Sequence, residues 1–400
     1  MVSKKIKDCE TIFYSRSEKI AFDKSQVYIN SNPFPSDELK GSTTKDFAYA
    51  KMRSIYNQIL SRQYENLVVL SGSGTSVGIG SGKQKGKTMK GLWLAVRDKI
   101  TYKALEEFAE SIKFEELHED HTDLEAMLSK ATLSQRFLQD ANIQATINNI
   151  KEIIRKECTL KLPANAPHQI FLSKLTGRKL KYSRPKIFTL NYDLLFEQAA
   201  STGGYVVIDG FSFSYPRQFN GINFDFDIVS RKENRALSEE NFVPKVFQLY
   251  KPHGSLDWEK IIDGKTEKFI KNASTKNPLM IYPSNAKYEV SYEQPYFEML
   301  SRFQQEMRAQ NTILISIGFS FYDKHIKAMV DEALNVNPSI TLIIVSPDVK
   351  QESTFLDYKS RSERMGNVIL INETFSDFSL YYPESDIYSY QDEAETNESI

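Results

Sequence analysis

The sequence predicts an α/β fold in which helices cover a mostly parallel sheet and one helical module is inserted. Two observations predict this fold. Short apolar runs such as 67–70, which are typical of buried parallel strands, recur along the chain and alternate with helical patterns. A stretch of about 91–182 carries helical signals almost throughout, and within it Ile143, Ile147 and Ile154 recur at helical spacing. We therefore expect helical connections between the strands and one helical insertion.

The order of the elements divides the chain into three parts. Residues 1–43 are polar and irregular, so we expect an N-terminal arm that becomes ordered against a partner. A helical pattern over about 44–62 opens the main domain, which we place at 44–383. The segment 384–400 is acidic and polar, and we expect it to be disordered. The predicted strands are 67–70, 186–190, 205–208, 246–250, 279–282, 312–317, 340–345 and 368–371, with helices at about 139–157, 192–200, 292–310 and 322–335 and a hairpin turn at 263–264.

Composition and charge argue against several classes of protein. The formal net charge of the 400 residues is −1, so no global field attracts the chain to nucleic acid or to an anionic membrane. A basic run from Lys174 to Lys186 has no base-reading motif beside it, and we expect it to be solvated. The two cysteines, Cys9 and Cys158, cannot build a four-cysteine zinc site. The polar N-terminus resembles no signal peptide and no apolar run reaches membrane length, so we expect a cytoplasmic protein.

The most informative motif is the segment 187–196. A short apolar run ends at two polar residues, Asn191 and Asp193, and a helical pattern follows at once. In an open α/β sheet, ligands bind at the carboxyl ends of the strands. An amide and a carboxylate at such a strand end are candidates for holding or attacking a sugar. The alternative is that one of them only caps the next helix.

A glycine-rich loop follows the first buried strand. Its sequence is Ser71-Gly-Ser-Gly-Thr-Ser76, and backbone N–H groups at such a turn can bind an anion, because glycines allow a phosphate to approach closely. The spacing differs from the dinucleotide-binding fingerprint, since the third glycine position is occupied by Val77. A tight turn without a ligand is the alternative interpretation.

His253 follows another predicted strand, between a proline and a glycine. A histidine titrates near neutrality, so it can take a proton from water or from an alcohol. A purely structural histidine is the alternative, but the position at a strand end, like that of Asn191, favours a site.

Small and polar residues also follow the predicted strand 312–317. Gly318 comes directly after it, and Ser320 and Asp323 follow before the next helical pattern. The two polar side chains are suited to bind ribose hydroxyls. The alternative is that they cap the helix that begins there.

The order of these motifs along one chain resembles the sirtuin family and, within it, the bacterial branch of NAD-hydrolysing antiphage effectors. The resemblance covers about residues 44–375 and implies a Rossmann-like sheet with NAD lying across the strand ends. By this resemblance, Asn191 and His253 are catalytic, with His253 as the base, and Asp193 lies near the nicotinamide ribose. The remaining NAD-binding residues that it implies are Gly72, Ser73, Gly74, Thr75 and Ser76 for the pyrophosphate, and Gly318, Ser320 and Asp323 for the adenosine half.

The chain also departs from sirtuin deacetylases. It lacks their two cysteine pairs, which hold a structural zinc, so we expect no zinc. Their Gly-Ile-Pro-Asp-Phe-Arg stretch is replaced by Val77-Gly-Ile-Gly-Ser-Gly, which puts acyl-lysine chemistry in doubt. The resemblance therefore implies an NAD glycohydrolase that takes NAD as its substrate and releases nicotinamide and ADP-ribose. The alternatives are an NAD-dependent deacylase or ADP-ribosyl transferase, and a non-catalytic sensor of NAD or ADP-ribose.

The resemblance also implies partners. Effectors of this size without a sensor domain often assemble with a separately encoded ATPase of the HerA type or with another sensor, and a homo-oligomer is expected. No residue pattern in the chain identifies the partner.

Overall fold

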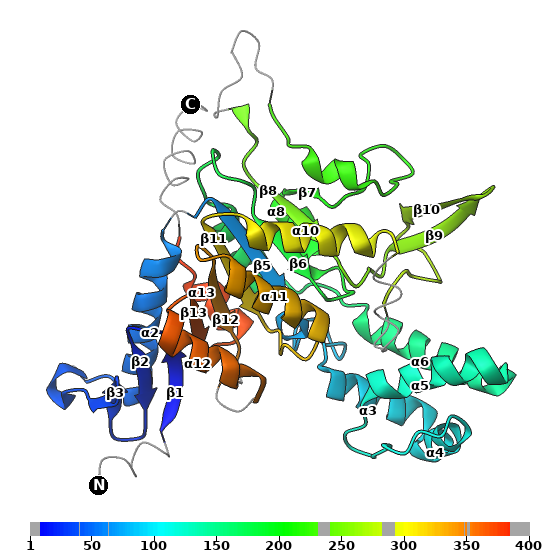
Figure 1. Cartoon of the computed structure of the whole chain (residues 1–400), viewed down its shortest axis with the longest axis horizontal. Helices are drawn as coiled ribbons and strands as arrows, with labels where there is room; N and C mark the ends of the chain where they lie inside the picture. The colour runs from blue at the N-terminus through cyan, green and yellow to red at the C-terminus, as the bar shows by residue number, and fades with distance from the viewer. Residues whose placement is uncertain are drawn as a thin grey trace.

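The computed structural model describes residues 9–39, 41–62, 64–230, 241–281, 293–347, 349 and 353–384. Within them, one sheet of 11 strands has the order β4-β3-β2-β1-β13-β12-β11-β5-β6-β8-β7, and helices lie on both of its faces (Figure 1). The predicted α/β class with a mostly parallel, Rossmann-like sheet is confirmed.

The centre of the sheet is parallel. Each neighbouring pair from β13 to β7 is parallel, and most residues of these strands are buried, as their apolar runs predict. The strands of this part are β5 (Asn66–Ser71), β6 (Lys186–Thr189), β7 (Val206–Ile208), β8 (Val246–Tyr250), β11 (Thr312–Ile317), β12 (Thr341–Val345) and β13 (Val368–Ile371).

Two hydrophobic clusters hold the helices against the sheet. One contains Met52, Phe171 and Phe378 together with the strand residues of one face, and the other contains Phe303, Val330 and Tyr358 with those of the opposite face. The helices on the first face are α2 (Thr44–Leu60), α7 (Pro167–Thr176), α8 (Leu195–Gly203) and α13 (Phe375–Tyr381). Those on the second face are α10 (Tyr296–Arg308), α11 (Lys324–Val336) and α12 (Leu356–Met365). Short 3-10 turns lie at η2 (Ser36–Leu39), η3 (Ser73–Thr75), η4 (Gly221–Asp225) and η6 (Ser353–Phe355).

The N-terminal segment is not an irregular arm. It forms four antiparallel strands that extend the sheet from β13, and β1 pairs Phe13 with Ile371. The prediction of an irregular segment is wrong here because each strand is too short to show a pattern, and pairing with an existing edge supplies the missing burial of Ile12 and Phe13. These strands are β1 (Glu10–Tyr14), β2 (Lys19–Phe22), β3 (Val27–Ile29) and β4 (Asn32–Pro33). Of the predicted acidic tail, all but Glu384 lies outside the described residues.

The helical module has a core of its own. Trp93, Met127 and Ile150 are fully buried in it, and the module lies to one side of the sheet (Figure 1). Asp123 and Asp140 cap two of its helices through their side chains. Its helices are α3 (Met89–Ile100), α4 (Tyr102–Ser111), α5 (Leu124–Leu138) and α6 (Ala141–Cys158). The last helix of the predicted insertion, α7, packs on the sheet instead.

The predicted hairpin forms as β9 (Trp258–Asp263) and β10 (Thr266–Lys271), with Asp263 opposite Thr266 at its turn. The predicted strand at 279–282 is reduced to one isolated bridge between Gly254 and Met280, and its last residue lies outside the described part. No helix in the described part combines the length and the apolar character needed to cross a membrane.

Candidate active site

The strand order creates a switch point at β5. From β5 the chain continues to β6 on one side, whereas β11, reached later, lies on the other side. The connections at the carboxyl ends of β5 and β11 therefore run in opposite directions. In open α/β sheets, ligands bind in the crevice at such a point.

Asn191 and His253 lie at the same level beyond the carboxyl ends of β6 and β8. Phe188 in β6 lies opposite Tyr250 in the neighbouring parallel strand β8, and their rings stack with centroids 4.2 Å apart. Asn191 and His253 each follow three residues after this pair. The structure therefore places both predicted catalytic residues at the same carboxyl edge.

The glycine-rich loop after β5 packs directly on the loop after β11. A Cβ atom added at Gly74 would lie 2.5 Å from the Cα of Gly318, and one at Gly72 would lie 2.6 Å from the Gly318 carbonyl oxygen. The Gly74 N–H donates to that same oxygen at 2.9 Å. Glycine is thus required at these positions because two backbones approach each other, whether or not a phosphate binds.

Most backbone donors of this loop already have acceptors. The N–H groups of Gly72 and Gly74 donate to the carbonyl oxygens of Ile317 and Gly318 at the end of β11. Those of Thr75 and Ser76 donate within the 3-10 turn η3, to the carbonyl oxygens of Gly72 and Ser73. The expected cradle of N–H groups for a pyrophosphate is therefore largely occupied. Phosphate binding by this loop remains a prediction and would use the exposed Ser73 or a rearranged turn.

The Asn191 amide ties the end of β6 to the glycine-rich loop. Its Nδ2 donates to the Gly72 carbonyl oxygen at 2.9 Å, to Thr75 Oγ1 at 3.0 Å and to Ser76 Oγ at 2.8 Å. A carbonyl oxygen only accepts, so the contact with Gly72 fixes which end of the amide is nitrogen. The amide oxygen is then the atom that can accept a hydrogen bond from a ribose hydroxyl or from water.

Asp193 belongs to the same hydrogen-bond network, through Ser76. Its Oδ2 accepts from Ser76 Oγ at 2.6 Å, and its Oδ1 accepts from the Leu195 N–H at 3.1 Å, where α8 begins. Burial raises the pKa of Asp193, and the nearby Lys251 ammonium and the Ser76 hydroxyl oppose that rise. Both carboxylate oxygens are engaged within the chain. The geometry therefore favours a positioning role for Asp193 over direct contact with the ribose.

Lys251 is a site residue that the sequence analysis did not single out. Its side chain is 2% exposed, and its ammonium donates to the Asp193 carbonyl oxygen at 2.5 Å and to Glu197 Oε1 at 2.9 Å. Burial raises the pKa of Glu197, and the Lys251 charge counters this shift. The pair fixes the turn that carries Asn191. A lysine directly after a buried strand and before Pro252 was the signal that could have indicated it.

The His253 ring lies close to the carboxylate of Asp323, which follows β11 on the other side of the switch point. Its Nε2 lies 3.5 Å from Asp323 Oδ2, and the two side chains are 13% and 12% exposed. Asp323 Oδ1 meanwhile accepts from the N–H groups of His325 and Ile326 and so caps α11. We expected Asp323 to line the adenosine half or to cap the helix. It is a cap and it contacts His253.

The loop that delivers Asp323 is held in a strained conformation. Phe321 has a φ of 60°, which bulky residues rarely adopt, and its ring is 1% exposed. It packs on Phe319 and Tyr358, with ring centroids 4.7 Å away in both cases. Ser320, between the two phenylalanines, is partly exposed at the same edge. The aromatic packing therefore fixes the path of the chain from β11 to Asp323, whose carboxylate lies beside His253.

Residues 185–362 match a known protein family. The matching family is the SIR2-like domain. This match supports the sirtuin-like resemblance, and it includes Asn191, His253 and Asp323 but not the glycine-rich loop. No curated protein matches the chain.

The SIR2-like match has a functional consequence at a general level. SIR2-like domains are typically NAD-dependent enzymes, so the match implies NAD binding and an NAD-related activity.

Among the described residues, no group of three or more histidine, cysteine, aspartate or glutamate side chains could hold a metal ion.

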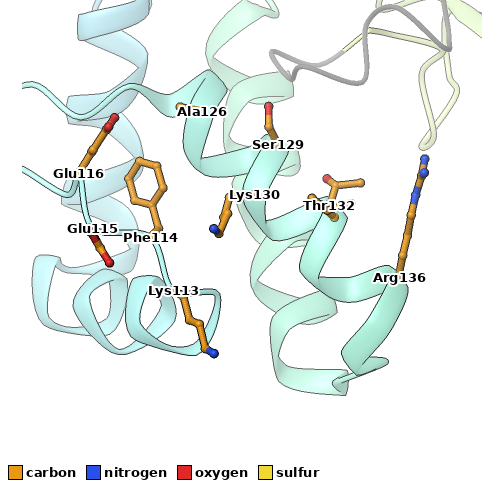
Figure 2. A pocket seen from close by; sticks show the side chains of 10 residues that line it. Lys113, Phe114, Glu115, Glu116, Ala126, Ser129, Lys130, Thr132 and Arg136 are labelled. Carbon is orange, nitrogen blue, oxygen red and sulfur yellow. The ribbon is translucent and has the colours of Figure 1, made fainter.

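A separate cavity of about 640 Å³ lies in the helical module, between the segment 113–116 and α5 (Figure 2). Side chains of both charges line it, including Glu115, Glu116 and Lys130. None of the residues discussed above lines it, so we do not assign it to the candidate active site.

Proposed function

We propose that the protein is an NAD glycohydrolase that cleaves the bond between nicotinamide and ribose and releases ADP-ribose. One observation carries the proposal. Within the SIR2-like segment, Asn191 and the His253–Asp323 pair lie at the same carboxyl edge of the sheet, beside its switch point. An amide that can hold a hydroxyl and a histidine that can take a proton are the groups that this hydrolysis needs.

The proposed chemistry follows from the charges that change. Cleavage passes through a sugar cation like that of glycoside hydrolysis, and nicotinamide leaves as a neutral molecule, so no acid has to protonate it. The Asn191 amide oxygen holds a ribose hydroxyl or the attacking water. His253 accepts the proton that the attacking oxygen loses. The Asp323 carboxylate, 3.5 Å from Nε2, orients the ring and offsets the charge that the ring acquires.

An NAD consumption assay tests the proposal. Together with the protein encoded next to it, the purified chain should release nicotinamide and ADP-ribose, separable by chromatography, and Asn191→Ala and His253→Ala should each reduce this turnover by about 10²–10⁴-fold. Asn191 also ties two segments together, so a thermal melt must show that each variant is folded. Asn149→Ala and His121→Ala are matched controls, because both residues are exposed in the helical module. They should retain full activity.

Other products would identify the alternatives. Undiminished hydrolysis by a folded Asn191→Ala/His253→Ala double variant would overturn the catalytic assignment. An acetylated peptide that yields O-acetyl-ADP-ribose would identify a deacylase, and transfer of ADP-ribose to a protein would identify a transferase. Tight NAD binding without turnover, with every candidate partner present, would identify a sensor.

We further propose that the activity depletes NAD in antiphage defence. In this role the protein would act as a homo-oligomer with a separately encoded ATPase of the HerA type or another sensor. An effector of this kind is silent until it is triggered. The assay is therefore run with and without the protein encoded next to it. NAD hydrolysis that proceeds at the same rate with and without the proteins encoded next to this one would argue against a triggered effector.

A further inference from the structure

A second cavity lies at the opposite edge of the sheet from Asn191 and His253. It measures about 360 Å³ and reaches Leu67 and Ile313, at the amino ends of β5 and β11. β5 has six residues, and at about 3.3 Å per residue the two edges are roughly 17 Å apart. A ligand in this cavity would therefore occupy a site separate from the candidate active site.

The cavity is strongly cationic. Among the described residues that line it, Arg62, Lys174, Arg178 and Lys179 are cationic and Glu384 is the one carboxylate. That carboxylate is 3.7 Å from the Lys174 ammonium, and its side chain is 83% exposed. An ion pair at this distance with a solvent-exposed carboxylate contributes little, so most of the positive charge is not balanced by the described lining.

Arg178 is the residue that most clearly requires an anion. It is only 9% exposed, and its Nη2 donates to the carbonyl oxygens of Tyr64 at 2.5 Å and Glu65 at 3.2 Å. Its Nε is buried without a hydrogen-bond partner, and no carboxylate in the described part of the chain forms an ion pair with it. Burial lowers the pKa of Arg178, and the described partners of its guanidinium are two carbonyl oxygens and the Tyr182 ring, whose centroid is 5.4 Å away, so none of them carries a negative charge. A buried cation of this kind is destabilising unless an anion neutralises it.

The remaining walls suit a small molecule with an apolar part. Leu60, Leu175, Tyr64 and Tyr382 line the cavity, and the Lys174 ammonium is held there by the carbonyl oxygens of Leu380 and Tyr382, at 2.6 and 3.0 Å. The lysine is thus fixed in place before any ligand arrives. A guanidinium fork matches the geometry of phosphate oxygens, and a fixed ammonium such as that of Lys174 adds a positive charge beside them.

We propose that this cavity is a binding site for a small phosphate-bearing molecule. The phosphate lies against Arg178 and Lys174, Arg62 and Lys179 close over it from the exposed rim, and the tyrosines contact the rest of the molecule. The site does not depend on the proposed NAD hydrolysis.

Calorimetric titration of the full chain with inorganic pyrophosphate at low salt tests the site. The wild type should bind, and Arg62→Gln/Lys179→Gln should weaken binding at least about tenfold, because two charges near the phosphate are lost. Both residues are exposed, so this double variant should fold even if Arg178→Met does not. Lys103→Gln, on an exposed face of the helical module, is the charge control and should bind like the wild type. Asn191→Ala should also bind normally, because it changes only the other edge.

Two results would overturn the proposal. One is unchanged binding by the Arg62→Gln/Lys179→Gln variant, which would place pyrophosphate elsewhere. The other concerns the acidic residues that follow Glu384 in the sequence. If pyrophosphate binds only after these residues are replaced by amides in the full chain, the carboxylates of the chain itself are the natural occupants.

Discussion

Asp193 joins two parts of the candidate site through its two carboxylate oxygens. Asp193→Ala would leave the Ser76 hydroxyl and the Leu195 N–H without these acceptors. Each buried polar group left unsatisfied costs about 1–3 kcal/mol, so for these two groups we expect the free energy of unfolding to fall by roughly 2–6 kcal/mol. Urea denaturation measures the change. The exposed cap Asp140→Ala is the control, with an expected loss of about 1 kcal/mol, and a similar small loss at Asp193 would contradict the assigned role.

Asp323 combines a helix cap with a contact to His253, and two substitutions separate these functions. Asp323→Asn should retain the cap, since asparagine caps helices equally well, but it removes the charge beside the ring. We expect kcat for NAD cleavage to fall about 10–100-fold with little change in KM or thermal stability. Asp323→Ala should in addition lower stability by about 1 kcal/mol. If Asp323→Asn instead raises KM and leaves kcat unchanged, the carboxylate binds NAD and does not position the histidine.

At the scale of elements, the loops after β5 and β11 interlock through glycine backbones. Gly74→Ala would place a Cβ atom 2.5 Å from the Cα of Gly318, a distance that forces the two loops apart. We expect reduced NAD turnover and a loss of stability of about 1–3 kcal/mol, typical of overpacking. Gly78→Ala is the control. It has a positive φ but open space around it, so only the backbone preference of about 1 kcal/mol should be lost. Equal effects of both variants would show that the close approach is unimportant.

At the scale of the whole molecule, a buried histidine makes stability depend on pH. His168 is fully buried between Phe196 and Phe375, neither of its ring nitrogens has a hydrogen-bond partner among the described residues, and burial lowers its pKa to about 3. Below the unfolded pKa of about 6.5, only the unfolded state takes up a proton. Stability should therefore fall as the pH decreases from about 6.5 towards 3.

His168→Phe should remove this acid sensitivity. Between about pH 7.5 and about pH 5, protonation of His168 in the unfolded state should lower the wild type's free energy of unfolding by roughly 2 kcal/mol. The variant lacks this histidine, so its free energy of unfolding should fall by roughly 2 kcal/mol less than that of the wild type. Urea denaturation at both pH values measures it. His121→Phe, an exposed histidine in the helical module, should show no such gain. If His168→Phe and the wild type lose the same stability in acid, other groups control the acid response.

The central sheet and its strand ends could be predicted because their signals are local. The apolar runs of β5, β8 and β11 and the polar residues after them are visible in the sequence, and chain order alone suggests that these ends meet at one edge. The N-terminal strands could not be predicted, since the burial of Ile12 and Phe13 depends on a partner strand more than 350 residues away. Short strands gain their stability from pairing, which leaves little trace in their own composition.

The sequence by itself determined the class of fold, the candidate residues Asn191 and His253, and the glycines of the first loop. Only the tertiary structure decided what each residue touches. It directed the nitrogen of Asn191 to the glycine-rich loop, engaged both oxygens of Asp193, and brought Asp323 to His253 across two intervening strands. The physical reason is that residue type sets which chemistry is possible, whereas hydrogen bonds and charge contacts are satisfied between segments distant in sequence. Backbone approach likewise shows that Gly74 must be a glycine for packing.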